Sequence, residues 1–319
     1  MVTRQLGRSG IAVSALGLGC WAIGGPTWRG AHPVGWGQVD DAASLRALAR
    51  AMELGVTFFD TADVYGCGHS ERILGRALAG RREQVVIATK FGNVFDEQTR
   101  QITGSDARPA SIQKACAASL RRLGTDYIDL YQFHLGDYPL EQAEAVRDTL
   151  EDLVVAGKIR AYAWSTDDPA RAGLFAEGPH CTAVQHRLNL LEDNPAMVAL
   201  CEELHLASIN RGPLAMGLLT GKFTPQSRLP EDDVRHGWDF RAGPVAERLH
   251  TLEAVREVLT SGGRTLAQGA LGWLWARSET TVPIPGFKTV EQVEDNVGAL
   301  GLGPLSGEQM VALAALLPR

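Results

Sequence analysis

Four side chains that can together deliver a proton stand where apolar segments of the sequence end. Asp60, Lys90 and His134 each follow a different apolar segment. Tyr65 comes five positions after Asp60, in a stretch that ends at a glycine. A carboxylate, an ammonium, an imidazole and a phenol in one place suit the reduction of a carbonyl group. In that reaction a hydride adds to carbon, and a proton must reach the oxygen.

The four side chains take different parts in such a reaction. A phenol, with a pKa of about 10, is a weak acid unless its anion is stabilised. A neighbouring ammonium lowers that pKa, and a carboxylate beside the ammonium keeps it charged. We therefore expect Tyr65 to donate the proton, Lys90 to activate it and Asp60 to hold Lys90. A neutral His134 would donate a hydrogen bond to the carbonyl oxygen.

Each residue also has an ordinary structural explanation when it is taken alone. Asp60 could cap its loop, Tyr65 could be packing, Lys90 could be a surface charge and His134 a core histidine. The four together favour a catalytic site, because catalytic groups of a barrel enzyme gather at the C-terminal ends of its strands.

The segments that position these residues alternate between strand and helix patterns along the whole chain. Eight short apolar runs predict strands at 15–19, 56–59, 84–89, 127–133, 159–164, 182–185, 206–209 and 281–284. Between them, apolar residues recur every three or four positions at 40–54, 109–123, 140–156 and 194–204. This alternation predicts a single (β/α)8 TIM barrel domain over residues 1–319.

Several segments lie outside the minimal barrel. Residues 3–5 and 11–13 predict a short N-terminal β-hairpin, and 244–276 holds two helical patterns split by Gly262-Gly263, so additional helices are expected near the C-terminus. Long loops are expected at 22–38, 91–108 and 222–243, after strands, where a barrel keeps its active site. A doubly wound sheet is the alternative architecture.

The composition restricts the class of protein. A formal charge of −6 with scattered charges gives no basic face, so we expect no nucleic-acid partner. Five cysteines without a C-x-x-C pair suit reduced thiols in the cytoplasm. The first residues contain no apolar leader, and no run approaches the roughly 20 apolar residues of a membrane span.

Two patterns resemble other sites but lack the required context. Gly17-Leu18-Gly19-Cys20-Trp21-Ala22 matches a dinucleotide fingerprint, yet Ile23-Gly24-Gly25-Pro26 follows where a helix must begin. Cys201 and His205 stand one helical turn apart, but no third ligand appears with metal spacing, so no metal site is expected.

Together with the four residues, a series of motifs resembles the aldo-keto reductase family, in particular its bacterial type. The motifs cover nearly the whole chain in order and are Leu6-Gly7-Arg8-Ser9-Gly10, Val13 to Gly19, Tyr65 to Glu71, Asp126 to Tyr131, Gly212 to Lys222 and Ile284-Pro285-Gly286. The family uses Asp, Tyr, Lys and His in this order. The resemblance therefore implies an NADPH-dependent enzyme that reduces an aldehyde or ketone to an alcohol.

The resemblance also implies where NADPH binds. In the family, a Ser-Asn pair and a Gln hold the nicotinamide carboxamide, and Thr166 here replaces the Asn. The stretch 217–222 is similar to the pyrophosphate clasp. The cofactor contacts implied in this way are Ser165, Gln185, Arg211, Gly212, Pro213, Leu214, Gly217, Leu219, Lys222, Gly286, Lys288, Thr289, Gln292 and Asn296.

Arg211 departs from the family, which commonly stacks an aromatic ring on nicotinamide from this position. The guanidinium plane can stack in the same way, or it can bind an anionic group of the substrate. The sequence leaves both roles open.

The segment after the eighth strand is the expected site of the adenosine 2′-phosphate. Thr289 and Gln292 have the spacing of a capping box, which would begin a helix whose N-terminus favours an anion. Lys288 adds a full charge, and the position of Asn296 matches the one that meets adenine. The family often has Arg in place of Gln292, so moderate preference for NADPH is expected.

The substrate is a small carbonyl compound or alcohol, and Trp21 is the expected wall of its pocket, with Trp28 and Trp36 nearby. An alcohol or sugar dehydrogenase working in reverse is the first alternative. A nucleotide-sensing regulatory subunit of a channel, built on the same barrel, is the second. A metal-dependent barrel hydrolase would need a ligand set that the sequence does not provide.

Overall fold

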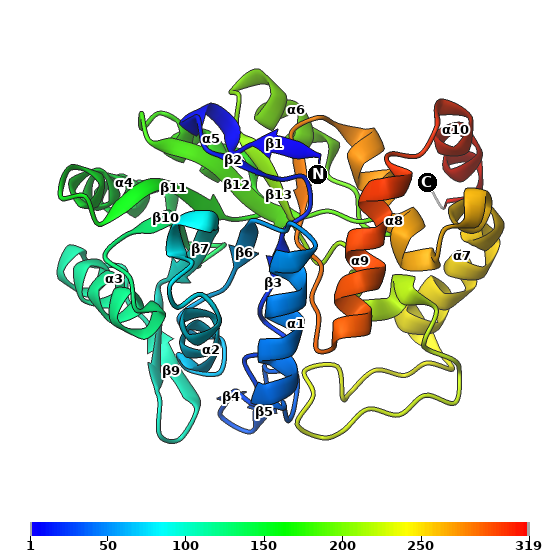
Figure 1. Ribbon diagram of the computed structural model, residues 1–319, viewed down its shortest axis with the longest axis horizontal. Helices are drawn as coiled ribbons and strands as arrows, with labels where there is room; N and C mark the ends of the chain where they lie inside the picture. Colours follow the sequence, from blue (N-terminus) through cyan, green and yellow to red (C-terminus); the bar gives the residue numbers. More distant parts are fainter. Residues whose placement is uncertain (1, 318–319) are drawn as a thin grey trace.

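The computed structural model describes residues 2–317 and is built around eight parallel strands (Figure 1). The strands are β3 (Leu18–Gly19), β6 (Phe58–Asp60), β7 (Val86–Phe91), β10 (Ile128–Phe133), β11 (Ile159–Ser165), β12 (Cys181–Arg187), β13 (Ala207–Arg211) and β14 (Thr281–Pro283). Each pairs with its neighbours in sequence order. The Gly17 amide donates to the Pro283 carbonyl at 3.0 Å, which brings the first and last strands together. The (β/α)8 barrel is therefore confirmed, and the doubly wound alternative is wrong.

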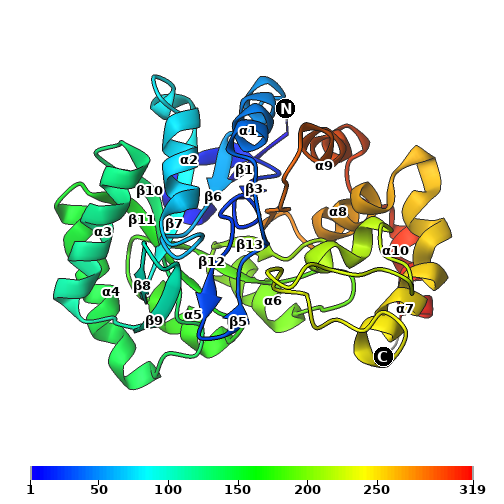
Figure 2. The ribbon, with the colours of Figure 1, turned by 90° about the horizontal axis from the view of Figure 1, so that it is seen from below.

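Helices surround the strands, as Figure 2 shows from the lower end of Figure 1. They are α1 (Asp41–Glu53), α2 (His69–Ala77), α3 (Pro109–Leu123), α4 (Leu140–Val155), α5 (Pro169–Ala176), α6 (Pro195–Glu203), α7 (Gly243–Thr260), α8 (Leu266–Arg277), α9 (Val290–Leu302) and α10 (Gly307–Leu316). Short 3-10 turns are η1 (Gly7–Ser9), η2 (Arg82–Gln84), η3 (Ala215–Thr220) and η4 (Ser261–Gly263). Helices α7 and α8 are the expected pair divided at 262–263, and α10 is the further C-terminal helix.

Alternation along the strands divides the apolar side chains between two cores. Phe58 belongs to the cluster inside the barrel, whereas Phe59 packs outward against the helices. The inner cluster also includes small residues such as Ala161, Ala163 and Ala183, which fit the narrow interior. Because side chains alternate in a strand, the last inward residue of each strand lies at the barrel mouth.

The N-terminal hairpin covers the other end of the barrel. Strand β1 (Thr3–Gln5) pairs antiparallel with β2 (Ala12–Ser14), as the sequence predicts. Leu6 lies between them with no exposed surface, inside the inner cluster. The Arg8 side chain donates to the carbonyls of Ala176, Gly178 and Cys181. These bonds hold the hairpin turn, η1, against the N-terminal end of the barrel.

Two of the expected loops contain short strands. Strands β4 (Trp28–Arg29) and β5 (His32–Pro33) form one hairpin, and β8 (Asn93–Asp96) and β9 (Gln101–Ser105) form another. Trp28 pairs with Gln101, so the hairpins join into a four-stranded sheet at the lower end of Figure 1. The description of 22–38 and 91–108 as loops alone was therefore wrong.

Candidate active site

The structure brings the four predicted residues together at the barrel mouth. Asp60 ends β6 and Lys90 lies in β7, each as the last inward residue of its strand. The Lys90 ammonium donates to Asp60 Oδ1 at 2.5 Å and to the Tyr65 hydroxyl at 3.1 Å. His134 follows β10, and its ring packs edge-on against Tyr65 with centroids 5.9 Å apart. One cation thus links the carboxylate to the phenol.

Lys90 has no exposed surface, so its charge depends on these neighbours. Burial disfavours the ammonium, but the Asp60 carboxylate and the Tyr65 oxygen more than offset this, and the pKa of Lys90 is raised above its usual value. A third bond, to the Thr61 carbonyl at 2.8 Å, fixes the direction of the side chain. Lys90 therefore stays charged at neutral pH.

The second oxygen of Asp60 is held by two glutamines. Gln132 and Gln185 each donate from Nε2 to Asp60 Oδ2 at 2.8 Å, and Gln185 also donates to Gln132 Oε1 at 3.1 Å. Gln132 was not among the predicted residues, although an amide between Leu130 and His134 on the inward face of β10 was a signal. The amide nitrogen of Gln185, expected at the nicotinamide carboxamide, is engaged here with Asp60.

Tyr65 stands on a turn that the first long loop holds in place. The Gly66 amide donates to Thr27 Oγ1 at 3.0 Å. Gly66 has φ +61° and its Cα lies so close to Gly24 that an added Cβ would meet the Gly24 carbonyl oxygen at 1.8 Å. Only glycine fits there. Thr27 and Gly24 therefore position the phenol.

The acidity of Tyr65 differs from the sequence expectation. Burial raises the pKa of Tyr65, Lys90 lowers it, Asp60 raises it, and the net pKa is above the ordinary value. We expected Lys90 to bring the pKa below that value, but desolvation outweighs its charge. Lys90 still makes the phenol more acidic than burial alone would leave it.

His134 is neutral, as the proposed hydrogen bond to a carbonyl requires. Burial, followed by the charges of Lys90 and Arg211, holds the pKa of His134 well below its usual value. Among residues 2–317, its buried Nδ1 has no hydrogen-bond partner. The ring is therefore an uncharged group next to Tyr65.

Two tryptophans border the Tyr65 phenol. Trp21 stacks on Tyr65 with centroids 5.9 Å apart, and the Trp36 ring meets Trp21 edge-on at 5.3 Å. Trp21 thus lies beside Tyr65, and its contact with the substrate stays a prediction. Trp28 belongs to β4 in the small sheet instead.

The residues expected at the nicotinamide lie at the ends of β11, β12 and β13. Ser165 is the last residue of β11, on the same face as Ala163 of the inner cluster. The adjacent Thr166 hydroxyl donates to the Gly136 carbonyl at 2.9 Å and accepts from the Asp168 amide at 3.2 Å. Thr166 therefore serves the loop rather than presenting a free group.

The segment after β13 is folded into a compact turn. Arg211 pairs with Asp167 at 2.5 Å, and Asn189 donates to the Gly212 carbonyl at 3.1 Å. After Pro213, the Leu214 carbonyl accepts from the Leu219 amide at 3.2 Å. Leu219 has no exposed surface, so its side chain is part of the core.

Two cations, Lys222 and Arg235, lie beside Gly217, where the pyrophosphate clasp is expected. An added Cβ on Gly217 would meet the Lys222 ammonium at 3.2 Å and Arg235 Nη1 at 3.4 Å. Burial, and then Arg235, lowers the pKa of Lys222, and burial also lowers the pKa of Lys288. Cations that burial destabilises are ready to bind an anion. The residues present therefore fit a phosphate-bearing cofactor.

Arg235 is a second residue that the sequence interpretation missed. It is 6% exposed, binds Asp233 through Nε and Nη2 at 2.8 and 2.7 Å, and donates to the Met216 carbonyl at 3.0 Å. Its guanidinium also lies over the Trp36 ring, 4.2 Å from the centroid. The Asp233-x-Arg235 spacing within the long loop was the available signal.

Thr289 caps the N-terminus of α9 as expected, but the capping box is only half formed. The Thr289 hydroxyl accepts from the Gln292 amide at 3.3 Å. The Gln292 side chain accepts instead from the Lys288 amide at 2.7 Å, one residue before the position that a capping box uses. Asn296 is buried and donates to the Gly286 carbonyl at 3.4 Å.

The Lys288 ammonium bridges to the first long loop. It donates to the carbonyls of Trp36 and Gln38 at 2.6 and 3.3 Å. The backbone of Trp36 in turn forms an isolated antiparallel β-bridge with that of Asp233. The cation expected at the 2′-phosphate therefore also supports the loop that carries Trp36.

A second buried histidine predicts how stability depends on pH. His186 accepts from or donates to Ser208 Oγ at 2.7 Å, and burial lowers the pKa of His186 to about 4 from 6.5. Between these values the unfolded chain binds a proton that the folded chain does not, so stability falls as pH falls from 6.5 to 4. The full loss for this group is about 3 kcal/mol.

Urea unfolding midpoints measured from pH 7 down to pH 4.5 check this expectation. His186→Gln should show a shallower decline than the unchanged protein, and the exposed His250→Gln should show the same decline. Parallel curves for the unchanged protein and His186→Gln would contradict it.

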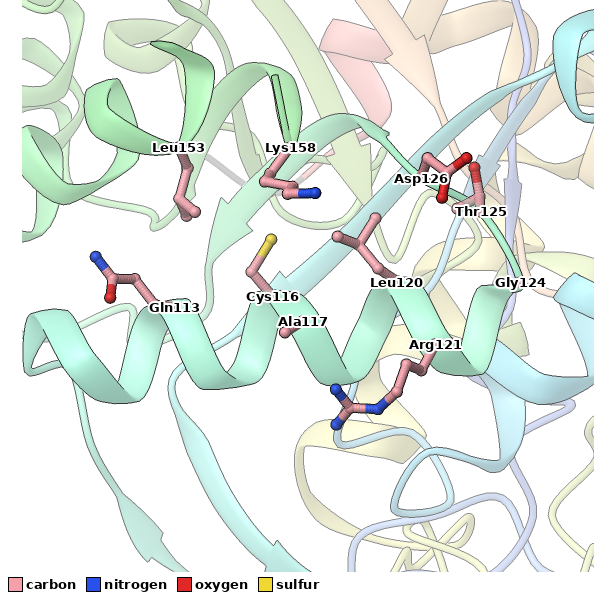
Figure 3. Close-up of a pocket in the computed structure, with 10 residues that line it drawn as sticks. All are labelled: Gln113, Cys116, Ala117, Leu120, Arg121, Gly124, Thr125, Asp126, Leu153 and Lys158. Carbon is pink, nitrogen blue, oxygen red and sulfur yellow. The ribbon is translucent and has the colours of Figure 1, made fainter. Parts of the chain in front are cut away.

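The structure also contains a surface groove away from the four candidate residues at the barrel mouth. It has a volume of about 600 Å³ and lies along α3, bordered by Cys116, Leu120, Leu153 and Lys158 (Figure 3). Burial raises the pKa of the Cys116 thiol to about 12, so it is not a reactive thiolate. Among residues 2–317, no group of His, Cys, Asp and Glu side chains is arranged to hold a metal ion. Every helix in this range is too short or too polar to cross a membrane.

Comparison with known proteins agrees with this geometry. Residues 15–318 match the sequence profile of the Aldo/keto reductase family. The chain is 32% identical over 308 residues to the aldo-keto reductase yakc [NADP(+)] of Schizosaccharomyces pombe, covering 93% of this chain and 86% of that protein.

Solved structures give the same result. The glycerol dehydrogenase AKR11B4 from Gluconobacter oxydans superposes with a TM-score of 0.85 at 30% identity, covering 98% of this chain and 94% of that one. An aldo/keto reductase from Klebsiella pneumoniae, solved with NADP and acetate, gives a TM-score of 0.71 at 29% identity, covering 99% and 96%. On its sequence, its barrel and these relatives, the chain belongs to the aldo/keto reductase family.

Proposed function

We propose that this enzyme uses NADPH to reduce an aldehyde or ketone to an alcohol, with Tyr65 as the proton donor. The observation that carries the proposal is the buried Lys90 ammonium, bonded at once to the Asp60 carboxylate and the Tyr65 hydroxyl. A paired carboxylate and ammonium alone could be structural. The phenol on the same cation, at the mouth of the barrel, supplies the proton that carbonyl reduction needs.

The protein's own groups divide the work of that reaction. His134 and the Tyr65 hydroxyl bind the carbonyl oxygen, and the neutral imidazole donates a hydrogen bond to it. As negative charge develops on that oxygen, Tyr65 gives up its proton, and Lys90 stabilises the phenolate that remains. Asp60, held by Gln132 and Gln185, keeps Lys90 charged and aimed at the phenol. Trp21 and Trp36 limit the access of water.

Bound NADPH supplies the hydride. Two relatives support this cofactor, since one is named for NADP(+) and another was solved with NADP. We assign Ser165 and the Oε1 atom of Gln185 to the nicotinamide, the turn from Gly212 to Leu214 to the nicotinamide end, and Gly217, Leu219 and Lys222 to the pyrophosphate. Arg235 joins this last group, because it lies beside Gly217 with Lys222.

The adenosine end is assigned to the start of α9, and this assignment makes a testable prediction. Lys288→Ala should weaken NADPH binding by roughly 1 to 3 kcal/mol, the range for losing a charge-assisted hydrogen bond. NADH, which lacks the 2′-phosphate, should bind nearly as before. Fluorescence titration with both nucleotides measures the difference.

The NADH titration is also the control for loop damage, because the Lys288 ammonium holds the carbonyls of Trp36 and Gln38. A loosened loop would weaken both nucleotides. Equal losses, or a preference of the unchanged enzyme for NADH, would contradict the assignment of Lys288, Thr289 and Gln292 to the 2′-phosphate.

Alcohol oxidation is the second candidate, and it is supported by the resemblance to a protein described as a glycerol dehydrogenase. The same residues serve it in reverse, with the tyrosine as proton acceptor. A nucleotide-sensing regulatory subunit is the alternative from another class.

Absorbance at 340 nm separates these functions. The enzyme is incubated with NADPH and a panel of aldehydes and ketones, and separately with NADP+ and glycerol or sugars. Consumption of NADPH supports the reductase, and faster formation of NADPH supports the dehydrogenase. Tight nucleotide binding with no turnover in either direction would support the sensor and contradict both enzymes.

A further inference from the structure

Two arginines end neighbouring strands at the catalytic end of the barrel. Arg187 is the last residue of β12 and Arg211 the last of β13, and the two are paired in the parallel register. Two positions earlier, Gln185 reaches Asp60 inside the barrel, and Ile209 belongs to the inner cluster. Because side chains alternate along a strand, both arginines continue inward-facing rows. They therefore stand at the rim of the catalytic mouth.

The charges around this pair do not cancel. Asp167 accepts from the Arg187 amide at 2.6 Å and from Arg211 Nη2 at 2.5 Å. Glu192 accepts from Arg187 Nη1 at 3.3 Å and from Arg248 Nη2 at 2.9 Å. Three guanidinium groups thus face two carboxylates, which leaves one positive charge in excess at the rim.

Arg211 has donors to spare and lies near the reacting groups. Of its five N–H donors, the structure engages only one at Nη2, and among residues 2–317 its Nε and Nη1 have no acceptor. Its side chain is one-third exposed. The charge of Arg211 also contributes to lowering the pKa of Tyr65 and of His134, so it acts at the place where the carbonyl would lie.

We infer that Arg211, with Arg187 beside it, forms an anion subsite of the substrate pocket, and that the preferred substrates are aldehydes or ketones bearing a carboxylate or phosphate. This inference rests on the proposed reductase function. A guanidinium offers parallel N–H donors that match either anion, and Asp167 fixes the plane of the Arg211 group. Arg187 and Arg248 supply the rest of the positive charge at the rim.

Matched substrates with and without one anionic group test the subsite. One pair is 4-oxobutanoate and its methyl ester, and the other is glyceraldehyde 3-phosphate and glyceraldehyde, so the two pairs also distinguish carboxylate from phosphate. The unchanged enzyme should prefer the charged member of at least one pair. Arg211→Gln should lower kcat/KM for that member by on the order of 10- to 100-fold, the range for a hydrogen bond to a charged group.

The neutral member of the pair should change less than about threefold, since the lost interaction is with the anion. Arg211→Lys keeps the positive charge but loses the parallel N–H donors of the guanidinium. Its kcat/KM for the charged member should lie between that of the unchanged enzyme and that of Arg211→Gln. Arg160→Gln is the matched control. Arg160 is a half-exposed arginine at the start of β11, at the opposite end of the strands from the mouth, where it binds Asp129. Its substitution should leave the charge preference unchanged.

Equal losses for charged and neutral substrates would overturn the inference and assign Arg211 to the nicotinamide. Absence of charge preference in the unchanged enzyme would also overturn it. A binding assay without turnover separates this failure from failure of the reductase function. Succinate or inorganic phosphate is titrated into the NADPH complex while tryptophan fluorescence is followed. Weaker binding in Arg211→Gln supports the subsite even when no carbonyl is reduced, and unchanged binding contradicts it.

Discussion

Tyr65→Phe should lower the rate of carbonyl reduction by on the order of 100-fold or more, the contribution typical of a general acid. The change removes one oxygen and keeps the ring that stacks on Trp21 and packs against His134. Lys90 loses a hydrogen-bond partner but keeps Asp60 and the Thr61 carbonyl. The loss should therefore fall on kcat, with the dissociation constant of NADPH nearly unchanged.

Tyr127→Phe is the matched control. Tyr127 lies just before β10, at the opposite end of the barrel, with the Arg82 guanidinium over its ring. The same oxygen is removed far from the mouth, so the rate should remain that of the unchanged enzyme. If Tyr65→Phe also retained that rate, the role assigned to Tyr65 would be wrong.

Lys90→Met and Asp60→Asn should each reduce the rate by a similar order of magnitude and move the alkaline limb of the pH profile in opposite directions. Lys90 lowers the pKa of Tyr65, so its removal raises that pKa and shifts the limb to higher pH. Removing Asp60 leaves burial as the largest influence on Lys90. The lysine then loses its proton at lower pH, and the alkaline limb shifts to lower pH.

The double variant tests whether the two residues act as a unit. Once Lys90 is absent, Asp60 has no ammonium to hold, so Lys90→Met with Asp60→Asn should be little slower than Lys90→Met alone. A strictly additive loss would show that they act separately. Lys114→Met, at an exposed lysine of α3, should change neither rate nor profile. Thermal unfolding of each variant identifies losses caused by instability, because breaking a buried ion pair is destabilising.

The barrel was predictable because its signals are local. Parallel strands buried on both faces appear as short apolar runs, and α3 has the bounds expected from the helical pattern at 109–123. The four-stranded sheet at the mouth was not predictable. Its strands β4 and β5 have two residues each, too few to show a period, and Trp28 meets Gln101 only in the folded chain.

The meeting of the four candidate residues at the barrel mouth was predictable for a related reason. A polar residue where an apolar strand ends is visible in sequence, and parallel strands bring their ends to one place. The supports of these residues were not visible. Gln132 binds Asp60, which is 72 positions away, and Arg235 becomes significant only when its loop reaches Gly217 and Trp36.

Energetic balances were the hardest part to predict. Both desolvation and Lys90 act on Tyr65, and their relative size depends on how deeply the phenol is buried. The Gln292 side chain could likewise accept from the amide of Lys288 or of Thr289. The backbone conformation at the start of α9 places the Lys288 amide within its reach. Spacing alone carries no information on either balance.

The central claim is that hydride reaches a carbonyl carbon at the Tyr65 site. A single turnover with NADPH deuterated at both C4 positions, followed by mass spectrometry of the product, tests it directly. We expect one deuterium on the carbon that was the carbonyl, a proton from solvent on the oxygen, and at least about 100-fold slower product formation in Tyr65→Phe. Oxidation of NADPH without deuterium in the product, or equal labelling rates in both proteins, would contradict the account.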